Sequence, residues 1–307
     1  MTSKIKILII INILLLAGVF LSLIQTEEQS SVQVEGQLFV VNDTAHIQRI
    51  EVGTHELTRQ GDQNWKLNGR YTVAPQAIQT LLTVMQNMEV KRPVTEENIS
   101  GVNQEFNKKG INVKVFGAEG VMKRYSLYGD SVNTYAKVPG EAPYLVYVPG
   151  YFINLDKLYR INEREWRDKR VLYTTFRTMK NLQVDYPVSP DKSFQIAFDS
   201  SFYKVSGVQK LDSAAVYNYI SMFGNLAAND YLENTSLRDS LAKQVPFCVI
   251  TMKDLYEKRN NTVRFYPGPQ VVYGLSENTK EVVLFDPRRI QTAFVSREAF
   301  MRKEKSK

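Results

Sequence analysis

The pattern of apolar and polar residues repeats at a fixed distance along the chain. The stretch "NWKLNGRYTVAPQAIQTLLTVMQNM" at residues 64–88 shares its layout with the later "FYKVSGVQKLDSAAVYNYISMFGNL". A shift of 138 residues places Trp65 on Tyr203 and Ile78 on Val216, and nearly every apolar residue of the first stretch then meets another. In each copy, apolar residues three and four positions apart predict an amphipathic helix after a strand and a turn.

The same shift still matches apolar positions further along. The segment "YSLYG" falls on "VRFYP", with Tyr128 on Tyr266. Short alternating segments separated by turns surround both copies, and such segments indicate antiparallel strands. The sequence therefore predicts an α+β protein in which an antiparallel sheet with helices occurs twice, at residues 45–160 and 177–300, through internal duplication.

Four residues are predicted to hold this architecture together. Gly69 and Gly207 mark the chain reversal before each helix, and Trp65 lies on the preceding strand. Between the repeats, residues 161–176 form a charged segment, "NEREWRDKRVLY" being its centre, with opposite charges four positions apart. This spacing predicts a solvated connector helix, with Trp166 as an anchor into a neighbouring domain.

The amino terminus carries one long apolar run. Residues 7–25 contain no charged side chain, and a helix of this length spans roughly 27 Å, enough to cross a bilayer core. Lysines precede the run in the stub 1–6, and two glutamates follow it in the linker 26–44, so the positive-inside rule places the amino terminus in the cytoplasm. The residues expected to face lipid are Ile7, Leu14, Leu15, Leu16, Phe20 and Ile24.

A cleaved signal peptide is the alternative interpretation of this run. Its apolar stretch is usually shorter, and no small-x-small cleavage site follows Leu23. We therefore expect an uncleaved, single-pass anchor in a bacterial inner membrane, with the body of the protein in the periplasm.

The anchor, the doubled hairpin-plus-helix unit and the Trp-Arg-Asp-Lys element at Trp166 to Lys169 resemble a bacterial domain-of-unknown-function family. Its members are single-pass extracytoplasmic proteins, many of them encoded beside gliding-associated auxiliary ABC-transporter components. The resemblance covers roughly residues 45–295. It implies an accessory role at the cell envelope, with ABC-transporter subunits among the candidate partners, and no catalytic residue.

No cofactor or metal chemistry is expected. The two histidines, His46 and His55, are too few for a zinc site, and no phosphate-binding loop or nucleophile motif occurs. The single cysteine, Cys248, lies in an apolar strand typical of a buried, inert thiol. The net charge of +7 is spread along the chain and includes the basic tail 301–307, so nucleic acid is not expected as a partner.

One short pattern suggests a modification. Asp followed by Ser or Thr and then an apolar residue resembles the acceptor sequence of a bacterial O-glycosylation system. Turn and helix-cap chemistry explains the same pattern equally well. The hydroxyl-bearing residues of this pattern are Thr44, Ser131, Ser213 and Ser240.

Two functions remain in view. The first is a non-catalytic accessory or scaffold protein that offers sheet edges to other envelope proteins. The second is a carbohydrate-binding or hydrolytic module with a cleft between the repeats, in which the tyrosine pairs Tyr144/Tyr147 and Tyr217/Tyr219 stack on sugars. We favour the first, which makes the chain a non-enzyme.

Overall fold

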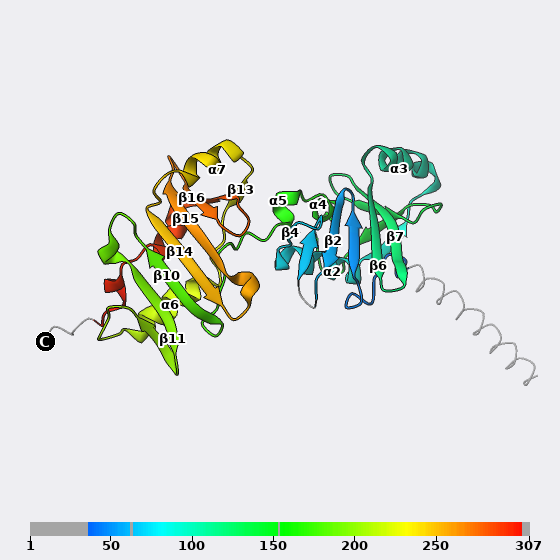
Figure 1. The fold of residues 1–307 in the computed structure, drawn as a ribbon. Helices are drawn as coiled ribbons and strands as arrows, with labels where there is room; N and C mark the ends of the chain where they lie inside the picture. The colour runs from blue at the N-terminus through cyan, green and yellow to red at the C-terminus, as the bar shows by residue number, and fades with distance from the viewer. Residues whose placement is uncertain (1–35, 62–63, 153, 303–307) are drawn as a thin grey trace, which may run out of the picture. The chain divides into compact units, whose positions relative to one another are not determined.

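The computed structural model describes residues 36–61, 64–152 and 154–302, which fall into two compact units. Unit 1 ends at Arg167 and unit 2 begins at Asp168 (Figure 1). Each unit is built on one antiparallel sheet with a few helices, so the predicted α+β class is confirmed. The anchor 7–25, with its lipid-facing residues, and the end of the basic tail lie outside the described residues. No helix within the described ranges is long and apolar enough to cross a membrane.

Unit 1 contains a nine-stranded sheet in the order β4-β3-β2-β1-β6-β7-β8-β9-β5 (Figure 1). All neighbouring strands are antiparallel. The strands are β1 (Arg49–Val52), β2 (His55–Arg59), β3 (Trp65–Leu67), β4 (Tyr71–Thr72), β5 (Glu89–Pro93), β6 (Ile111–Gly117), β7 (Gly120–Gly129), β8 (Thr134–Lys137) and β9 (Tyr144–Tyr147).

Unit 2 contains an eight-stranded antiparallel sheet in the order β12-β11-β10-β14-β15-β16-β17-β13. If β4 is set aside, this is the strand order of unit 1, with each strand taking the same rank along the chain. The strands are β10 (Met179–Asp185), β11 (Phe194–Asp199), β12 (Phe202–Val205), β13 (Asp230–Leu232), β14 (Cys248–Asp254), β15 (Asn261–Pro267), β16 (Val272–Ser276) and β17 (Val282–Phe285).

The register of strand pairing is also shared between the two sheets. The pairs in equivalent places, first unit before second, are Leu57–Leu67 and Ile196–Val205, Val113–Tyr125 and Ile250–Val263, and Leu127–Ala136 and Phe265–Gly274. The offset between equivalent residues changes from strand to strand: it is 137 from Val113 to Ile250, and in the last strand 139 from Val146 to Phe285. The shift of 138 residues read from the sequence is therefore not constant along the units.

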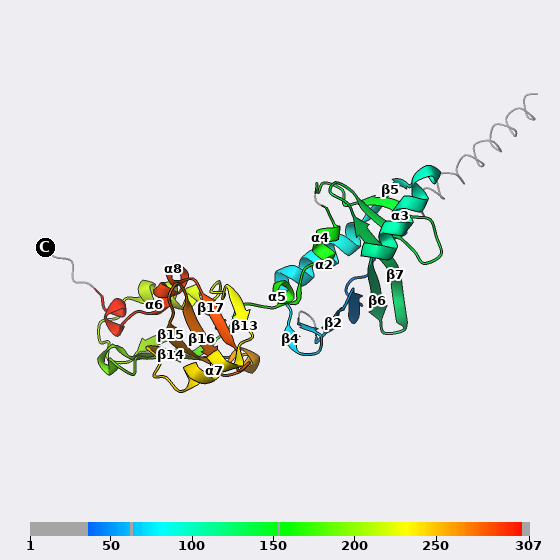
Figure 2. The same cartoon turned by 90° about the horizontal axis from the view of Figure 1, so that it is seen from above.

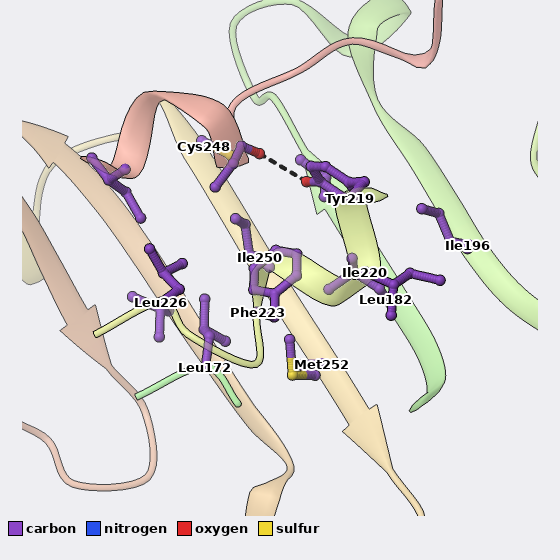
Figure 3. Close-up of a cluster of buried hydrophobic side chains, with 14 of the residues drawn as sticks. Leu172, Leu182, Ile196, Tyr219, Ile220, Phe223, Leu226, Cys248, Ile250 and Met252 are labelled. Carbon is purple, nitrogen blue, oxygen red and sulfur yellow. Dashed lines mark hydrogen bonds between the residues drawn. The ribbon is translucent and has the colours of Figure 1, made fainter. Parts of the chain in front are cut away.

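A long helix covers one face of each sheet and closes its main core. In unit 1 this is α2 (Pro75–Asn87), which begins with a proline in its first turn and buries Ile78 in the same cluster as Leu127. In unit 2 it is α6 (Ser213–Met222), whose first turn is capped by the Asp212 carboxylate. Figure 3 shows Ile220 of α6 beside Leu182 and Phe223, just after α6, beside Ile250, all within the main core of unit 2.

A second helix lies on the opposite face of each sheet. Phe106 of α3 (Glu96–Lys109) packs edge-on against Tyr128, at 5.8 Å between ring centroids. Leu241 of α7 (Thr235–Ala242) belongs to a small separate cluster with Tyr266. Tyr128 and Tyr266 each follow an inward-facing strand residue, so the alternation of side chains along a strand places them on the outer face. Figure 2 shows α3 and α2 on different sides of the first sheet.

Two different turns explain the extra strand of unit 1. Asn68 and Gly69 both have positive φ (50° and 68°), as a type I′ turn requires, and this turn continues into β4. In the matching turn of unit 2, Gly207 has positive φ (74°) but the preceding Ser206 does not, and the turn is closed by the Val208 amide and the Val205 carbonyl (3.2 Å). Such a turn matches the twist of paired strands less well, and no strand follows it.

The predicted connector 161–176 is divided between the two units and does not form one helix. Helix α5 (Glu163–Trp166) spans only four residues, held by a capping box between Asn162 and Glu165. Trp166 is fully buried in the core of unit 1, and its carbonyl accepts from the Ala74 amide at 2.7 Å. To bury this ring, the chain packs against unit 1 and α5 ends at Trp166. The stabilisation from burial outweighs the charge spacing that favoured a continuous helix.

The end of unit 2 repeats this arrangement. A short 3₁₀ turn (Arg297–Phe300) buries Phe300, whose carbonyl accepts from the Asp212 amide at 2.8 Å. Asp212 and Ala74 both precede the long helix of their unit. The segment around Trp166 is thus the closing element of unit 1, equivalent to the closing element of unit 2.

Candidate functional site

The titratable residues of the described structure are dispersed. Among the described ranges, no three His, Cys, Asp or Glu side chains approach one another closely enough to hold a metal ion. The ring of His46 contacts the exposed carboxylate of Asp43 within the same loop. His55 lies on β2, and its buried Nδ1 atom has no hydrogen-bond partner in the described structure. The two histidines belong to separate local environments.

Cys248 is a core residue of unit 2. Its side chain is inaccessible to solvent and interacts with Tyr186 and Tyr219; Figure 3 shows it on the strand that also carries Ile250. Burial raises the pKa of the Cys248 thiol to about 12, and a hydrogen bond with Tyr186 opposes this only in part. The thiolate, which is the reactive form, is therefore absent at neutral pH.

The buried carboxylate of Asp254 has a structural role. The Oδ2 atom of Asp254 accepts hydrogen bonds from the hydroxyls of Thr174 (2.6 Å) and Thr178 (2.7 Å). Its Oδ1 atom accepts from the Tyr256 amide (2.9 Å) and lies 3.7 Å from the Arg259 guanidinium. This network ties the first residues of unit 2 to the end of β14, and both oxygens of the carboxylate are engaged in it.

The residues of the Asp-Ser/Thr pattern occupy different local structures. Ser131 is exposed in the turn between β7 and β8, where the Asp130 carboxylate accepts from the amides of Val132 and Asn133. Ser213 and Ser240 are exposed but helical, in α6 and α7, and Thr44 is half-buried. Of the four, Ser131 alone combines an exposed residue with a turn.

The four predicted structural residues lie in turns and cores. Trp65 and Trp166 are buried in the core of unit 1, and Gly69 and Gly207 stand in the positive-φ turns described above. Gly207 faces the Arg297 side chain, which lies 3.3 Å from where a Cβ atom would stand.

The predicted tyrosine pairs do not form stacking platforms. In the pair on α6, Tyr219 is buried and donates to the Ala293 carbonyl (2.8 Å), whereas Tyr217 is half-exposed. In the pair on β9, Tyr144 packs against Phe39, and the exposed Tyr147 donates to Glu89. Each pair is split between inside and outside, because neighbours at these spacings point in different directions.

Sequence reasoning missed an aromatic cluster at the end of the β11–β12 hairpin, which we call the hairpin cluster. The centroids of rings in contact lie 4.9 to 6.0 Å apart, and Phe176 contacts three of the other members. Phe198 and Tyr217 are about half exposed (53% and 51%). The members of the hairpin cluster are Phe176, Phe198, Phe202, Tyr203 and Tyr217.

The equivalent positions of unit 1 are different in kind. The pairing of the hairpin strands makes Phe198 equivalent to Arg59 and Tyr203 equivalent to Trp65. The Arg59 guanidinium lies over the Trp65 ring, 4.8 Å from the ring centroid. Tyr217 falls with Gln79. The aromatic residues at these places in the second copy were visible in the sequence, but only the fold brings them together with Phe176.

The free edges of the two sheets also differ. In unit 1 the strand β3 is covered by β4, and the other edge strand, β5, ends in the exposed run Lys91, Arg92 and Pro93. Charged residues and proline are common protection for an edge. In unit 2 the terminal strands are β12 and β13, and β12 lies directly beside the hairpin cluster.

A cavity opens on each of the described units. One of about 390 Å³ in unit 2 is lined by Tyr186, Val188, Ser189, Lys192, Phe247, Phe294, Val295 and Ser296. The other, of about 250 Å³, lies in unit 1 against α2 and is lined by Gln76, Ala77, Thr80, Leu81, Leu158 and Ile161. The residue of unit 2 that is equivalent to Leu81 is Tyr219, and its larger ring is buried in the core of unit 2.

Comparison of the chain with protein-family models, with curated proteins and with solved structures finds no match.

Proposed function

We propose that this protein is a non-catalytic, membrane-anchored accessory or scaffold protein of a bacterial cell-envelope complex. Its two units derive from an internal duplication, which the common strand order and pairing register support. The apolar run 7–25 tethers the units to the inner membrane, and a transport-related assembly of the ABC or gliding type is the candidate context.

The observation that carries the proposal is the β12 edge with the hairpin cluster beside it. A terminal strand offers unpaired backbone groups to an incoming strand of a partner. Exposed aromatic rings next to that edge supply apolar contact, and aromatic residues are enriched at the centres of protein interfaces. Unit 1 has an arginine and a glutamine at the matching positions of Phe198 and Tyr217, so unit 1 does not repeat this surface.

The experiment compares native membranes that carry the wild-type chain with membranes that carry Phe198→Ser/Tyr217→Ser. Both rings are half-exposed, so the double variant is expected to fold. The wild-type chain should co-purify with a stoichiometric envelope partner, and the variant should lose it. The matched control is Val121→Ser/Val132→Ser in unit 1, which removes two exposed apolar residues elsewhere. A wild-type chain that leaves the membrane as a lone monomer contradicts the proposal.

A carbohydrate-binding module is the second candidate, since exposed aromatic rings also stack on sugars. It predicts saturable binding of the purified chain to cell-wall polysaccharide, lost in Phe198→Ser/Tyr217→Ser with no protein partner involved.

A further inference from the structure

The cavity of about 390 Å³ is lined in part by a loop of unit 2 that is longer than its equivalent in unit 1. Strands β1 and β2 are joined by the two-residue turn Gly53–Thr54. The equivalent strands β10 and β11 are joined by the loop Tyr186–Ser193, which forms one wall of the cavity. Two units that agree in register but differ here point to a role for the loop beyond folding.

The walls of the cavity are held in place before any ligand arrives. The Tyr186 amide donates to the Ser193 hydroxyl (2.9 Å), which closes the loop on itself. The Tyr186 hydroxyl donates to the Val295 carbonyl (2.8 Å), which joins the loop to the opposite wall. Pro190 opens a 3₁₀ turn and restricts the backbone further. A preorganised site loses little conformational entropy on binding.

One side of the cavity is apolar and aromatic. Phe247 and Phe294 meet edge-to-face with their ring centroids 4.9 Å apart, and both are partly exposed to the cavity. Val188 and Val295 extend this side. The volume lies at the low end of the roughly 300–1,000 Å³ that is usual for small-molecule sites, which combine apolar walls with few polar groups.

The other side presents hydrogen-bond donors. Lys192 is exposed, and its ammonium group makes no hydrogen bond or ion pair with any residue in the described ranges. Ser189 lies three residues before it on the same loop and lines the cavity with its hydroxyl unpaired in those ranges. An ammonium and a hydroxyl on one short loop suit a carboxylate, which accepts from both.

No carboxylate side chain of the described residues lines the cavity, although three belong to residues next to or two positions from lining residues in the chain. Asp185 accepts from the Gln183 amide (3.0 and 3.1 Å), and Glu298 is bound by the Ser296 hydroxyl, which lowers the pKa of that carboxyl. Asp191 is exposed on the loop itself. Cys248 does not line the cavity: its thiol is fully buried and contacts Tyr186, and burial keeps it protonated.

The geometry points to a binding site for a small organic carboxylate whose aromatic or branched apolar body fits between Phe294 and Val188. In this assignment, Lys192 and Ser189 hold the anionic group. A site of this kind makes the second unit a sensor or carrier of a small acid, in addition to the scaffold role proposed above. It does not depend on that role, since it uses neither β12 nor the hairpin cluster.

The test uses the full chain in nanodiscs and three probes of one shape: benzoate, benzyl alcohol and benzylamine. Saturation-transfer NMR with competition measures their affinities for the wild type, Lys192→Met and the control Lys243→Met, an exposed lysine of the same unit. Benzoate should bind saturably and more tightly than the other two. Lys192→Met should weaken benzoate about tenfold, since a hydrogen bond to a charged group contributes about 1.5 kcal/mol, and leave benzyl alcohol unchanged.

A second variant keeps the test independent of charge. Val188→Trp places a large ring at an exposed wall position (77% exposed) and should abolish binding of both benzoate and benzyl alcohol without unfolding the unit. The assignment is overturned if benzoate binds no better than benzylamine, if Lys192→Met and Lys243→Met behave alike, or if Val188→Trp binds benzoate as the wild type does.

Discussion

Replacing Trp166 by alanine should unfold the first unit selectively. The indole is fully buried, and the Trp166 carbonyl receives the Ala74 amide just before α2 begins. Removal of a buried tryptophan side chain costs about 3–5 kcal/mol, because the lost apolar transfer energy is joined by the energy of the cavity left behind. With a denaturant slope of about 2 kcal/mol per molar urea, a loss of about 4 kcal/mol lowers the midpoint by about 2 M.

The chain provides its own reporter for this experiment. Its only two tryptophans are Trp65 and Trp166, both in unit 1, so tryptophan fluorescence follows that unit alone. Trp65 remains in the variant and is buried (3% exposed), which keeps the signal sensitive to unfolding. Far-ultraviolet circular dichroism follows both units together. Trp166→Ala should shift the fluorescence midpoint and only the matching part of the dichroism transition.

Two matched variants sharpen the result. Phe300 occupies the equivalent place in unit 2, so Phe300→Ala should shift the dichroism transition and leave the fluorescence midpoint unchanged. Trp166→Phe should cost only about 1 kcal/mol, because the buried Nε1 atom has no hydrogen-bond partner in the described structure and the second unit accepts phenylalanine there. A fluorescence midpoint that does not move in Trp166→Ala would show that the segment is a connector after all.

Three further outcomes follow from the contacts of single residues. Burial raises the pKa of Cys248 from 9.0 to about 12, so above pH 9 the folded state keeps a proton that the unfolded chain releases, and unit 2 should lose stability as pH rises. Urea titrations between about pH 8 and 10 measure how the free energy of unfolding changes with pH. Cys248→Ala should make this dependence shallower. Asp254→Asn should destabilise unit 2 by about 2 kcal/mol, since the Arg259 charge loses its buried partner; unchanged dichroism unfolding would contradict the network. Ser131 should be the modified residue if the native protein is an O-glycoprotein, so intact mass should fall to the unmodified value in Ser131→Ala, and an unmodified wild-type mass removes the idea.

Much of the architecture could be predicted from local pattern. The period of apolar residues in "AIQTLLTVM" and "AVYNYISMF" depends only on which side of a helix faces the core, and it identified α2 and α6. Short alternating segments with glycine turns indicated antiparallel strands for the same reason, since neighbouring side chains point to opposite faces. The Asn68–Gly69 turn is likewise a local signal for the hairpin that follows.

The charged segment before unit 2 shows where local pattern fails. Opposite charges four apart stabilise a helix by only a few tenths of a kcal/mol per pair. Burial of the Trp166 ring is worth several times more, so the chain ends α5 after one turn and closes the core. The sequence contained the tryptophan, but the residues before α2 that it meets lie about ninety positions earlier in the chain.

The candidate sites depended on tertiary structure more than the fold did. Phe176, which precedes β10, and Tyr217 of α6 are about forty residues apart in the chain. They meet only in the folded unit, where Phe176 also contacts Phe202 and Tyr203 of β12. The cavity wall at Lys192 and the opposite wall at Phe294 are joined by a hydrogen bond between Tyr186 and Val295, across more than a hundred residues. The sequence by itself determined the doubled pattern, the sheet type and the long helices, because these follow from the period of burial within each segment. Long-range packing decided which side chains share a surface, because such a surface is built from segments far apart in the chain. Its composition depends on the strand register and the turns of all these segments together.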